Sequence, residues 1–226
     1  MININSQEAL FNEIGRALPK KLVVYSIGGT AMMLHGLKGE TLDIDLVFDK
    51  ESDRKIFIGT LEAMKFRKDE RRVIEQYGLK KNTPEIFRLK SDDFIFDLFL
   101  NKIVSSVFSD GMKERAKQTH EFGNNLVIKA ADPHDILIMK SVTSREKDSV
   151  DIIAIVNTGH INWDLIVEEA KEQVHLGNET AILGLGEKLD KLANRKLIII
   201  PKEILDKLWR LLNKQVKDGA KKKKER

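Results

Sequence analysis

One stretch constrains the fold more than any other part of the chain: Ile27–Phe48, with the sequence IGGTAMMLHGLKGETLDIDLVF. It follows a compact apolar run, Leu22–Ile27, which is typical of a buried strand and ends at two glycines. Glycines permit a tight turn, after which Thr30 is expected to cap a short helix built from Ala31–Leu37. A second strand follows, so the stretch predicts a strand, a turn, a helix and a strand in quick succession.

The second strand carries acidic residues at alternate positions. Between Leu42 and Phe48 the alternation predicts one face with Asp43, Asp45 and Val47, and a core face with Ile44, Leu46 and Phe48. Carboxylates at positions i and i+2 of a strand lie roughly 6.5–7 Å apart at Cα. Their oxygens can therefore converge on one Mg²⁺ or bridge two.

The glycine turn offers a second kind of ligand. The backbone N–H groups of Gly28, Gly29 and Thr30 are expected to point out of the turn toward an anion, and a triphosphate would fit there. The alternative is that these residues form only a structural turn between a strand and a helix.

A third acidic residue lies inside a later apolar run. Glu85–Leu89 and Phe94–Leu100 are separated by the turn-forming residues Lys90–Asp93, a pattern that predicts an antiparallel hairpin. Asp97 interrupts the second strand of this hairpin. Burying a lone carboxylate is costly, so Asp97 is expected to face a cation, a cleft or a hydrogen-bond donor.

Taken together, the GGTA turn, the His35-Gly36 pair, the TLDIDL run and the later acid resemble the nucleotidyltransferase superfamily of the DNA polymerase β type. The resemblance is greatest to small prokaryotic nucleotidyltransferases, including the AbiE-type toxins. It implies an α+β fold, in which a nucleotidyltransferase-type mixed sheet with flanking helices is followed by a helical C-terminal domain. It also implies that Asp43, Asp45 and Asp97 are catalytic and hold Mg²⁺, as two ions, while the glycine turn binds the nucleotide.

A later segment, DILIMKSVTSREKDSVDIIAI, resembles a second block of the same enzymes. The resemblance implies that Lys140 neutralises triphosphate charge, and that Asp148 and Asp151 orient Lys140, Arg145 or Lys147 rather than bind metal. The alternative is a set of surface ion pairs, such as Arg145 with Asp148. In the first block, His35 is expected to pack or to form a hydrogen bond, and Thr41 to order the loop before the acids.

The remaining chain is expected to be mostly helical. Helices are predicted at residues 7–18 with Ser6 as the N-cap, 52–64, 134–142, 145–156, 162–175, 179–192 and from Pro201 onward. Residues 66–82 are charged, and their pattern does not decide between strand and helix. We expect a nucleotidyltransferase domain at residues 1–110, a helical C-terminal domain at 111–218 and a basic, disordered tail at 219–226.

Composition limits the class of protein. The chain has 226 residues, no cysteine and no apolar run near the roughly 18 residues that a membrane span needs. Met1–Ser6 lacks the basic start of a signal peptide, so a cytoplasmic protein without disulfides or thiolate metal sites is expected. Net charge is only +4, and the final KKKKER carries most of the excess.

Two functions therefore remain. The first is an enzyme that moves a nucleoside monophosphate from an NTP to an acceptor, for example RNA such as a tRNA 3′ end, a protein hydroxyl or a small molecule such as an aminoglycoside. The resemblance allows such an enzyme to be the toxin-like partner of a toxin–antitoxin pair. The second is a nucleotide-binding or interaction module that keeps the fold without turnover.

Overall fold

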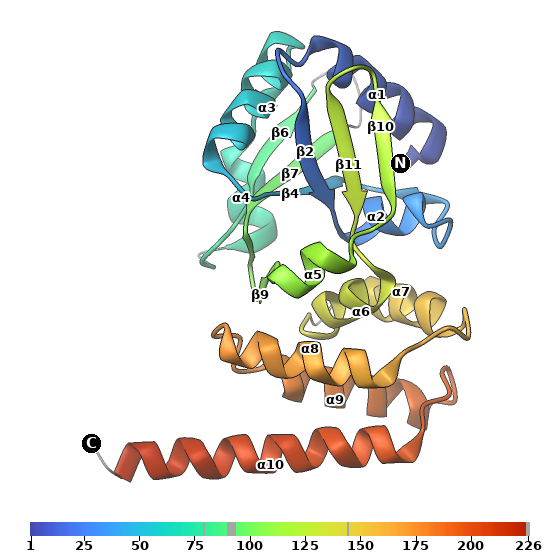
Figure 1. The fold of residues 1–226 in the computed structure, drawn as a ribbon, viewed down its shortest axis with the longest axis vertical. Coiled ribbons are helices and arrows are strands. Elements are labelled where there is room, and N and C mark those ends of the chain that lie inside the picture. The colour runs from blue at the N-terminus through green and yellow to red at the C-terminus, as the bar shows by residue number, and fades with distance from the viewer. Residues whose placement is uncertain (79, 90–93, 144, 225–226) are drawn as a thin grey trace. The chain divides into compact units, whose positions relative to one another are not determined.

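The computed structural model describes residues 1–78, 80–89, 94–143 and 145–224. The chain divides into two compact units, Met1–Ile136 and Leu137–Arg226. The first unit carries a mixed sheet with flanking helices, and the described residues of the second form helices joined by turns (Figure 1). The expected α+β class, with helices at the C-terminal end, is confirmed.

The strands all belong to the first unit. They are β1 (Ile2–Asn3), β2 (Leu22–Ser26), β3 (Glu40–Thr41), β4 (Ile44–Phe48), β5 (Arg67–Lys68), β6 (Glu85–Arg88), β7 (Ile95–Leu100), β8 (Lys102–Ile103), β9 (Ser106–Val107), β10 (Thr119–Phe122) and β11 (Leu126–Ala130). The main sheet has the order β10-β11-β2-β4-β7-β6-β5, with β8 and β9 continuing from β7, and β1 pairs with β3. The pairs β11–β2 and β4–β7 are parallel and the other pairs are antiparallel, which makes the sheet mixed.

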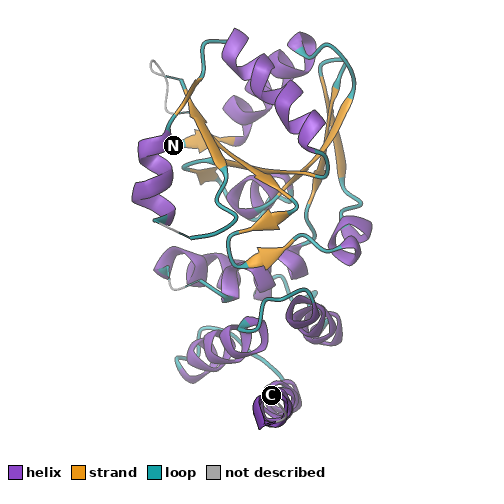
Figure 2. Cartoon of the chain, turned by 90° about the vertical axis from the view of Figure 1, so that its left-hand side faces the viewer, coloured by secondary structure: helices purple, strands orange, loops and turns teal. Residues whose placement is uncertain are grey.

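The described residues of the first unit form five helices beside the sheet, and Figure 2 shows helices and strands in different colours. They are α1 (Ile4–Ala17), α2 (Gly28–Leu34), α3 (Glu51–Ala63), α4 (Glu70–Tyr77) and α5 (Asp110–Arg115). The N-terminus of α1 differs from the expected one. Asn3, not Ser6, caps the helix: the Ser6 N–H donates to Asn3 Oδ1 at 2.9 Å, and the Asn3 N–H donates to Ser6 Oγ at 3.1 Å.

Helix α3 covers one face of the two central strands. The ring of Phe57 lies 5.4 Å from that of Phe48 on β4 and 5.8 Å from that of Phe96 on β7. Because side chains alternate across a strand, the opposite face of these strands carries Asp45 and Asp97. The aromatic core under α3 thus fixes which face the acids occupy.

The strand with the acid pair differs from the expected one in two ways. It begins at Ile44, so Asp43 lies just before β4 rather than within it. The face that carries Asp45 is also largely covered, since Val47 has no exposed surface and Asp45 is half-buried. The alternation of Asp43, Asp45 and Val47 did not predict this burial.

The hairpin expected around Asp97 is confirmed, since β6 and β7 pair antiparallel. Its predicted turn, Lys90–Asp93, lies outside the described residues. The expectation of helices from Gly111 onward is wrong for part of that region: β10 and β11 are strands, and β11 pairs in parallel with β2. The first compact unit accordingly extends to Ile136.

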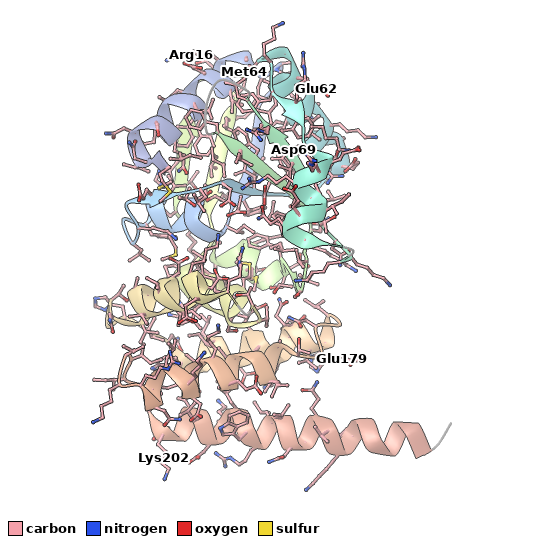
Figure 3. All side chains as sticks on the ribbon, turned by 180° about the vertical axis from the view of Figure 1, so that it is seen from behind. Arg16, Glu62, Met64, Asp69, Glu179 and Lys202 are labelled. Carbon is pink, nitrogen blue, oxygen red and sulfur yellow. The ribbon has the colours of Figure 1, made fainter. Side chains whose placement is uncertain are left out.

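The second unit is built from helices around an aliphatic core. Helix α6 (Pro133–Ser141) crosses the boundary and is followed by α7 (Glu146–Val156), α8 (Trp163–His175), α9 (Ala181–Asn194) and α10 (Lys202–Lys224). Leu185, Leu189 and Leu208 have no exposed surface. Helix α10 is also hydrogen-bonded to the residues before α9, since Gln215 Nε2 donates to the Glu179 carbonyl at 2.8 Å. Figure 3 labels Glu179, and Lys202 at the start of α10.

The C-terminal end of the chain differs from the expected one. Helix α10 extends to Lys224, whereas the sequence predicted disorder from residue 219; Glu225 and Arg226 lie outside the described residues.

No helix in the described part of the chain combines the length and the apolarity that crossing a membrane requires.

Candidate nucleotidyltransferase site

Strand pairing brings two of the predicted carboxylates together. In the parallel pair β4–β7, Asp45 lies directly opposite Asp97. Paired residues on neighbouring strands project from the same face, and the strands themselves lie about 4.8 Å apart. Asp97 is fully buried, Asp45 is half-buried, and Asp43 is 8% exposed just ahead of β4. Asp97, which lies in the β6–β7 hairpin, is thus the direct neighbour of Asp45 in the Asp-x-Asp pair.

The glycine turn lies against these acids. Gly28 has φ +56°, and a Cβ at this position would lie 2.6 Å from Asp45 Oδ2. A Cβ at Gly29 would lie 2.3 Å from Thr41 Oγ1. A Cβ at either position would force the Asp45 carboxylate or the Thr41 hydroxyl to move, so the two glycines allow the backbone of α2 to approach these side chains.

Thr30 joins helix α2 to strand β4 by a hydrogen bond. The helix begins at Gly28 with Ile27 as its N-cap, so Thr30 lies inside the first turn instead of capping it as expected. The buried Thr30 Oγ1 accepts the Asp45 N–H at 2.9 Å and lies 3.5 Å from the Asp43 carbonyl. The Ile27 N–H donates to the Asp45 carbonyl at 3.2 Å. These bonds fix the glycine turn relative to both acids.

Two further residues, from α4, contact the third acid. Tyr77 Oη donates to Asp97 Oδ2 at 2.5 Å. Gln76 Nε2 lies 3.4 Å from the same oxygen and 3.1 Å from Tyr77 Oη. The Tyr77 ring meets that of Phe99 edge-on, with centroids 6.4 Å apart. Asp69, labelled in Figure 3, starts α4 by accepting the Arg72 N–H at 3.1 Å.

This contact could not be predicted from the sequence, because the pattern of residues 66–82 did not decide between strand and helix. The structure nevertheless explains how Asp97 is tolerated inside a strand of core residues. A phenol and an amide both lie within hydrogen-bonding distance of Asp97 Oδ2, so the carboxylate faces donors, one of the environments expected for it.

The tyrosine also reports on the electrostatics of the site. Burial raises the pKa of the Tyr77 phenol, and the negative charges of Asp97, Asp45 and Asp43 raise it further. Tyr77 is therefore a neutral hydrogen-bond donor at any physiological pH. All three predicted carboxylates raise the pKa of this one hydroxyl.

The donor set suits a hard divalent cation, because carboxylate oxygens are the ligands that Mg²⁺ prefers. No group of three or more acidic, histidine or cysteine side chains in the described part of the chain is already arranged around a metal position. In this conformation Asp97 Oδ2 receives the Tyr77 hydroxyl.

Lys140 lies in the second unit, in a buried ion cluster. Its Nζ lies 3.0 Å from Asp148 Oδ1 and 2.5 Å from Asp151 Oδ2, while Arg145 Nε lies 2.8 Å from Asp148 Oδ2. The hydroxyl of Thr143 also donates to Asp148. Asp148 and Asp151 thus hold Lys140 as expected. The alternative of a surface ion pair does not describe Asp148, which has no exposed surface.

The charges in this cluster stabilise one another. Burial alone would lower the pKa of Lys140, but Asp148 and Asp151 raise the pKa above its ordinary value. Burial would likewise raise the pKa of Asp148, but Lys140 and the hydrogen bond from Thr143 lower it. Lysine and aspartate are both ionised at neutral pH.

His35, the other polar residue of the first block, has a structural contact. Its Nε2 lies 2.9 Å from the Ala131 carbonyl. The hydrogen bond joins the end of α2 to the residue after β11, in line with a packing role.

The family is shown by a family model described as "Nucleotidyltransferase of unknown function (DUF6036)", which matches residues 7–181. The match spans well over half of the chain. The chain belongs to this family. The DUF6036 description gives the class of activity and leaves the substrate open. The matched residues include both the acid cluster of the first unit and the Lys140 cluster of the second.

No curated protein matches this DUF6036 chain. Among solved structures, it is similar to the crystal structure of JHP933 from Helicobacter pylori, with 13% identity over 99% of this chain and 100% of that one. The TM-score is 0.42, so this likeness adds nothing to the assignment of fold or function.

Proposed function

We propose that the chain is a Mg²⁺-dependent nucleotidyltransferase that moves a nucleoside monophosphate from an NTP to an acceptor. The observation that carries this proposal is the parallel β4–β7 pairing, which sets Asp97 beside Asp45 while Gly28 lies against the Asp45 carboxylate. Membership of a nucleotidyltransferase family supports the class of reaction. The order of elements resembles the DNA polymerase β type, which supports the assignment of roles.

Each residue has a definite task in this reaction. Asp43, Asp45 and Asp97 would hold the Mg²⁺ ions, which when bound neutralise phosphate charge and lower the pKa of the attacking hydroxyl. Asp97 would accept the proton of that hydroxyl. The backbone at Gly28, Gly29 and Thr30 would contact the phosphates, since the absence of side chains at Gly28 and Gly29 allows close approach.

The acceptor belongs to one of three classes. It is RNA, including a tRNA 3′ end, a protein hydroxyl or a small molecule such as an aminoglycoside. The resemblance to AbiE-type enzymes is the reason to propose that the chain acts as the toxin-like partner of a toxin–antitoxin pair.

A labelling experiment tests the proposal. The full chain is incubated with each α-³²P-labelled NTP, Mg²⁺ and either total RNA or a cell lysate, and both label transfer and pyrophosphate are measured. We expect one class of acceptor to become labelled, with loss of transfer in EDTA and in Asp43→Asn. Absence of label and of pyrophosphate with all four NTPs would contradict the proposal.

One observation favours a second candidate function, a nucleotide-binding module without turnover. Tyr77 already donates to Asp97, and the acids are not pre-arranged as a metal site in the described residues. The two functions differ in one readout. Thermal stabilisation by an NTP with Mg²⁺ but without pyrophosphate release would support the module.

A further inference from the structure

The hydroxyl of Tyr77 lies on the carboxylate of Asp97. In the proposed function, Asp97 takes the proton from an attacking hydroxyl. Tyr77 Oη already lies 2.5 Å from Asp97 Oδ2, within the distance at which a general base must meet the proton it accepts. The hydroxyl is thus directed at the acid that takes the proton in the proposed function.

The element that presents this hydroxyl is not part of the core. The side chains of α4 are half-buried or exposed, and Ile74 is 65% exposed. Near the site, the helix contacts β7 through Tyr77 itself, whose ring lies against Phe99 and whose oxygen lies on Asp97.

An acceptor on the same chain has a kinetic advantage over one in solution. Well-oriented intramolecular groups reach effective concentrations on the order of 10⁵ M or more. The Tyr77 hydroxyl would therefore compete strongly with an external hydroxyl whenever an NTP is bound. Gln76 Nε2, 3.1 Å from Tyr77 Oη, donates to that oxygen and leaves its proton directed at Asp97.

We infer that Tyr77 is a site of self-modification, at which the enzyme transfers a nucleoside monophosphate from an NTP to its own tyrosine. The inference rests on the proposed function. Tyr77 Oη attacks the α-phosphorus, a new O–P bond forms, and the bond from the α-phosphorus to the β-phosphate oxygen breaks. Pyrophosphate leaves, and the phenolic proton passes to Asp97. The product is a tyrosyl phosphodiester.

The modification would change the site. A nucleotidylated Tyr77 has no proton to donate, so Asp97 would lose its 2.5 Å hydrogen bond. The added phosphodiester also places a negative charge beside the acids. Self-modification would thereby release α4 from Asp97 and change the access of external acceptors.

The chain supplies a matched control, because it contains only two tyrosines. Tyr25 on β2 packs its ring against Phe108, with centroids 5.0 Å apart, and its charged neighbours are Asp49, Lys113 and Asp110. Tyr25→Phe and Tyr77→Phe each remove one hydroxyl and keep the ring. Only the second removes the hydroxyl on Asp97.

The experiment uses the full chain with each α-³²P-labelled NTP and Mg²⁺, in the presence and absence of cell lysate. Label on the chain is quantified in the wild type and in both variants, and the labelled residue is located by mass spectrometry of the wild type. We expect label at Tyr77, at the same level in Tyr25→Phe and reduced at least tenfold in Tyr77→Phe. The first-order rate should not depend on protein concentration.

The outcomes separate this inference from the proposed function. Label on lysate components but not on the chain, or label on the chain at another residue, would overturn self-modification of Tyr77 and leave the transferase intact. A purely positioning role for Tyr77 would give the first of these results, with slower external transfer in Tyr77→Phe. No label and no pyrophosphate with any NTP would overturn both. Even if Tyr77→Phe fails to fold, locating the labelled residue in the wild type by mass spectrometry shows whether Tyr77 is modified.

Discussion

Two glycines of the first unit share a backbone conformation but differ in their surroundings. Gly28 has φ +56° and Gly36 has φ +70°. A Cβ at Gly28 would lie 2.6 Å from Asp45 Oδ2, whereas a Cβ at Gly36 would meet no atom within 4 Å. Substitution by alanine costs about 1 kcal/mol of backbone strain at either position. Only at Gly28 does it also displace an acid of the site.

We predict that Gly28→Ala weakens NTP binding at least tenfold in Mg²⁺, whereas Gly36→Ala leaves the affinity within a factor of two. Titration calorimetry on folded protein measures both affinities, and denaturant unfolding shows whether the strain costs match. Equal affinities in the two variants would mean that the turn at Gly28 has only a structural role.

Thr30 permits a second test at the scale of single residues. Its buried hydroxyl accepts the Asp45 N–H at 2.9 Å, and valine has nearly the same shape without that acceptor. Leaving a buried N–H without a partner costs about 1–3 kcal/mol. We predict a loss of this size in the free energy of unfolding of Thr30→Val by urea, and a smaller loss in Thr30→Ser. A stability unchanged by valine would show that this bond does not hold α2 on β4.

At the scale of elements, α6 and α7 are joined by the pair of Lys140 and Asp148. Asp148 is fully buried, and removing one partner of a buried ion pair costs about 3 kcal/mol or more. We predict such a loss for Asp148→Asn at pH 7. Glu168→Gln, which removes an exposed i,i+3 pair with Lys171, should cost less than about 0.5 kcal/mol.

The effect should depend on pH with a definite sign. The pKa of Asp148 is lowered from 3.8, so its contribution is complete above that pH and is lost as the pH falls through the lower folded pKa. The pKa of Lys140 is raised from 10.5, so its contribution is complete below that pH and is lost as the pH rises through the higher folded pKa. Urea unfolding at several pH values should show a constant difference between wild type and Asp148→Asn from about pH 5 to 9. A difference that instead changes steadily across this range would contradict the assigned charges.

The sequence predicts those helices and strands whose own apolar periodicity and turn residues are clear. Apolar periodicity and turn residues indicated β2, the β6–β7 hairpin and helices such as α3 and α8 to within a few residues. The pairing of Asp45 with Asp97 depends on which strands are neighbours, and so it required the family resemblance. The strand Leu126–Ala130 is a short apolar run, which periodicity cannot distinguish from a buried helix segment. Tyr77 and Asp97 are far apart in sequence, and nothing near either residue predicts their contact.

At the scale of the whole molecule, charge is nearly balanced, with 39 basic and 35 acidic residues, and the C-terminal end carries most of the excess. If the acceptor is RNA, the end of the chain should add affinity that does not depend on sequence. We predict that truncation after Gly219 keeps NTP binding and makes the slope of log K against log salt shallower by roughly 3 for single-stranded RNA. Filter binding over a salt series measures the slope. An unchanged slope would leave the basic end with no more than a solubilising role.

The central claim is that the acids on β4 and β7 carry nucleotidyl transfer, and the rate of Mg²⁺-dependent pyrophosphate release tests it most directly. Asp45→Asn removes one charge from the site, while Asp49→Asn removes one from an exposed position at the end of the same strand. We predict a loss of at least about 100-fold in Asp45→Asn, with a melting temperature equal to or above that of the wild type because repulsion is relieved, and a wild-type rate in Asp49→Asn. A wild-type rate in folded Asp45→Asn would contradict the account.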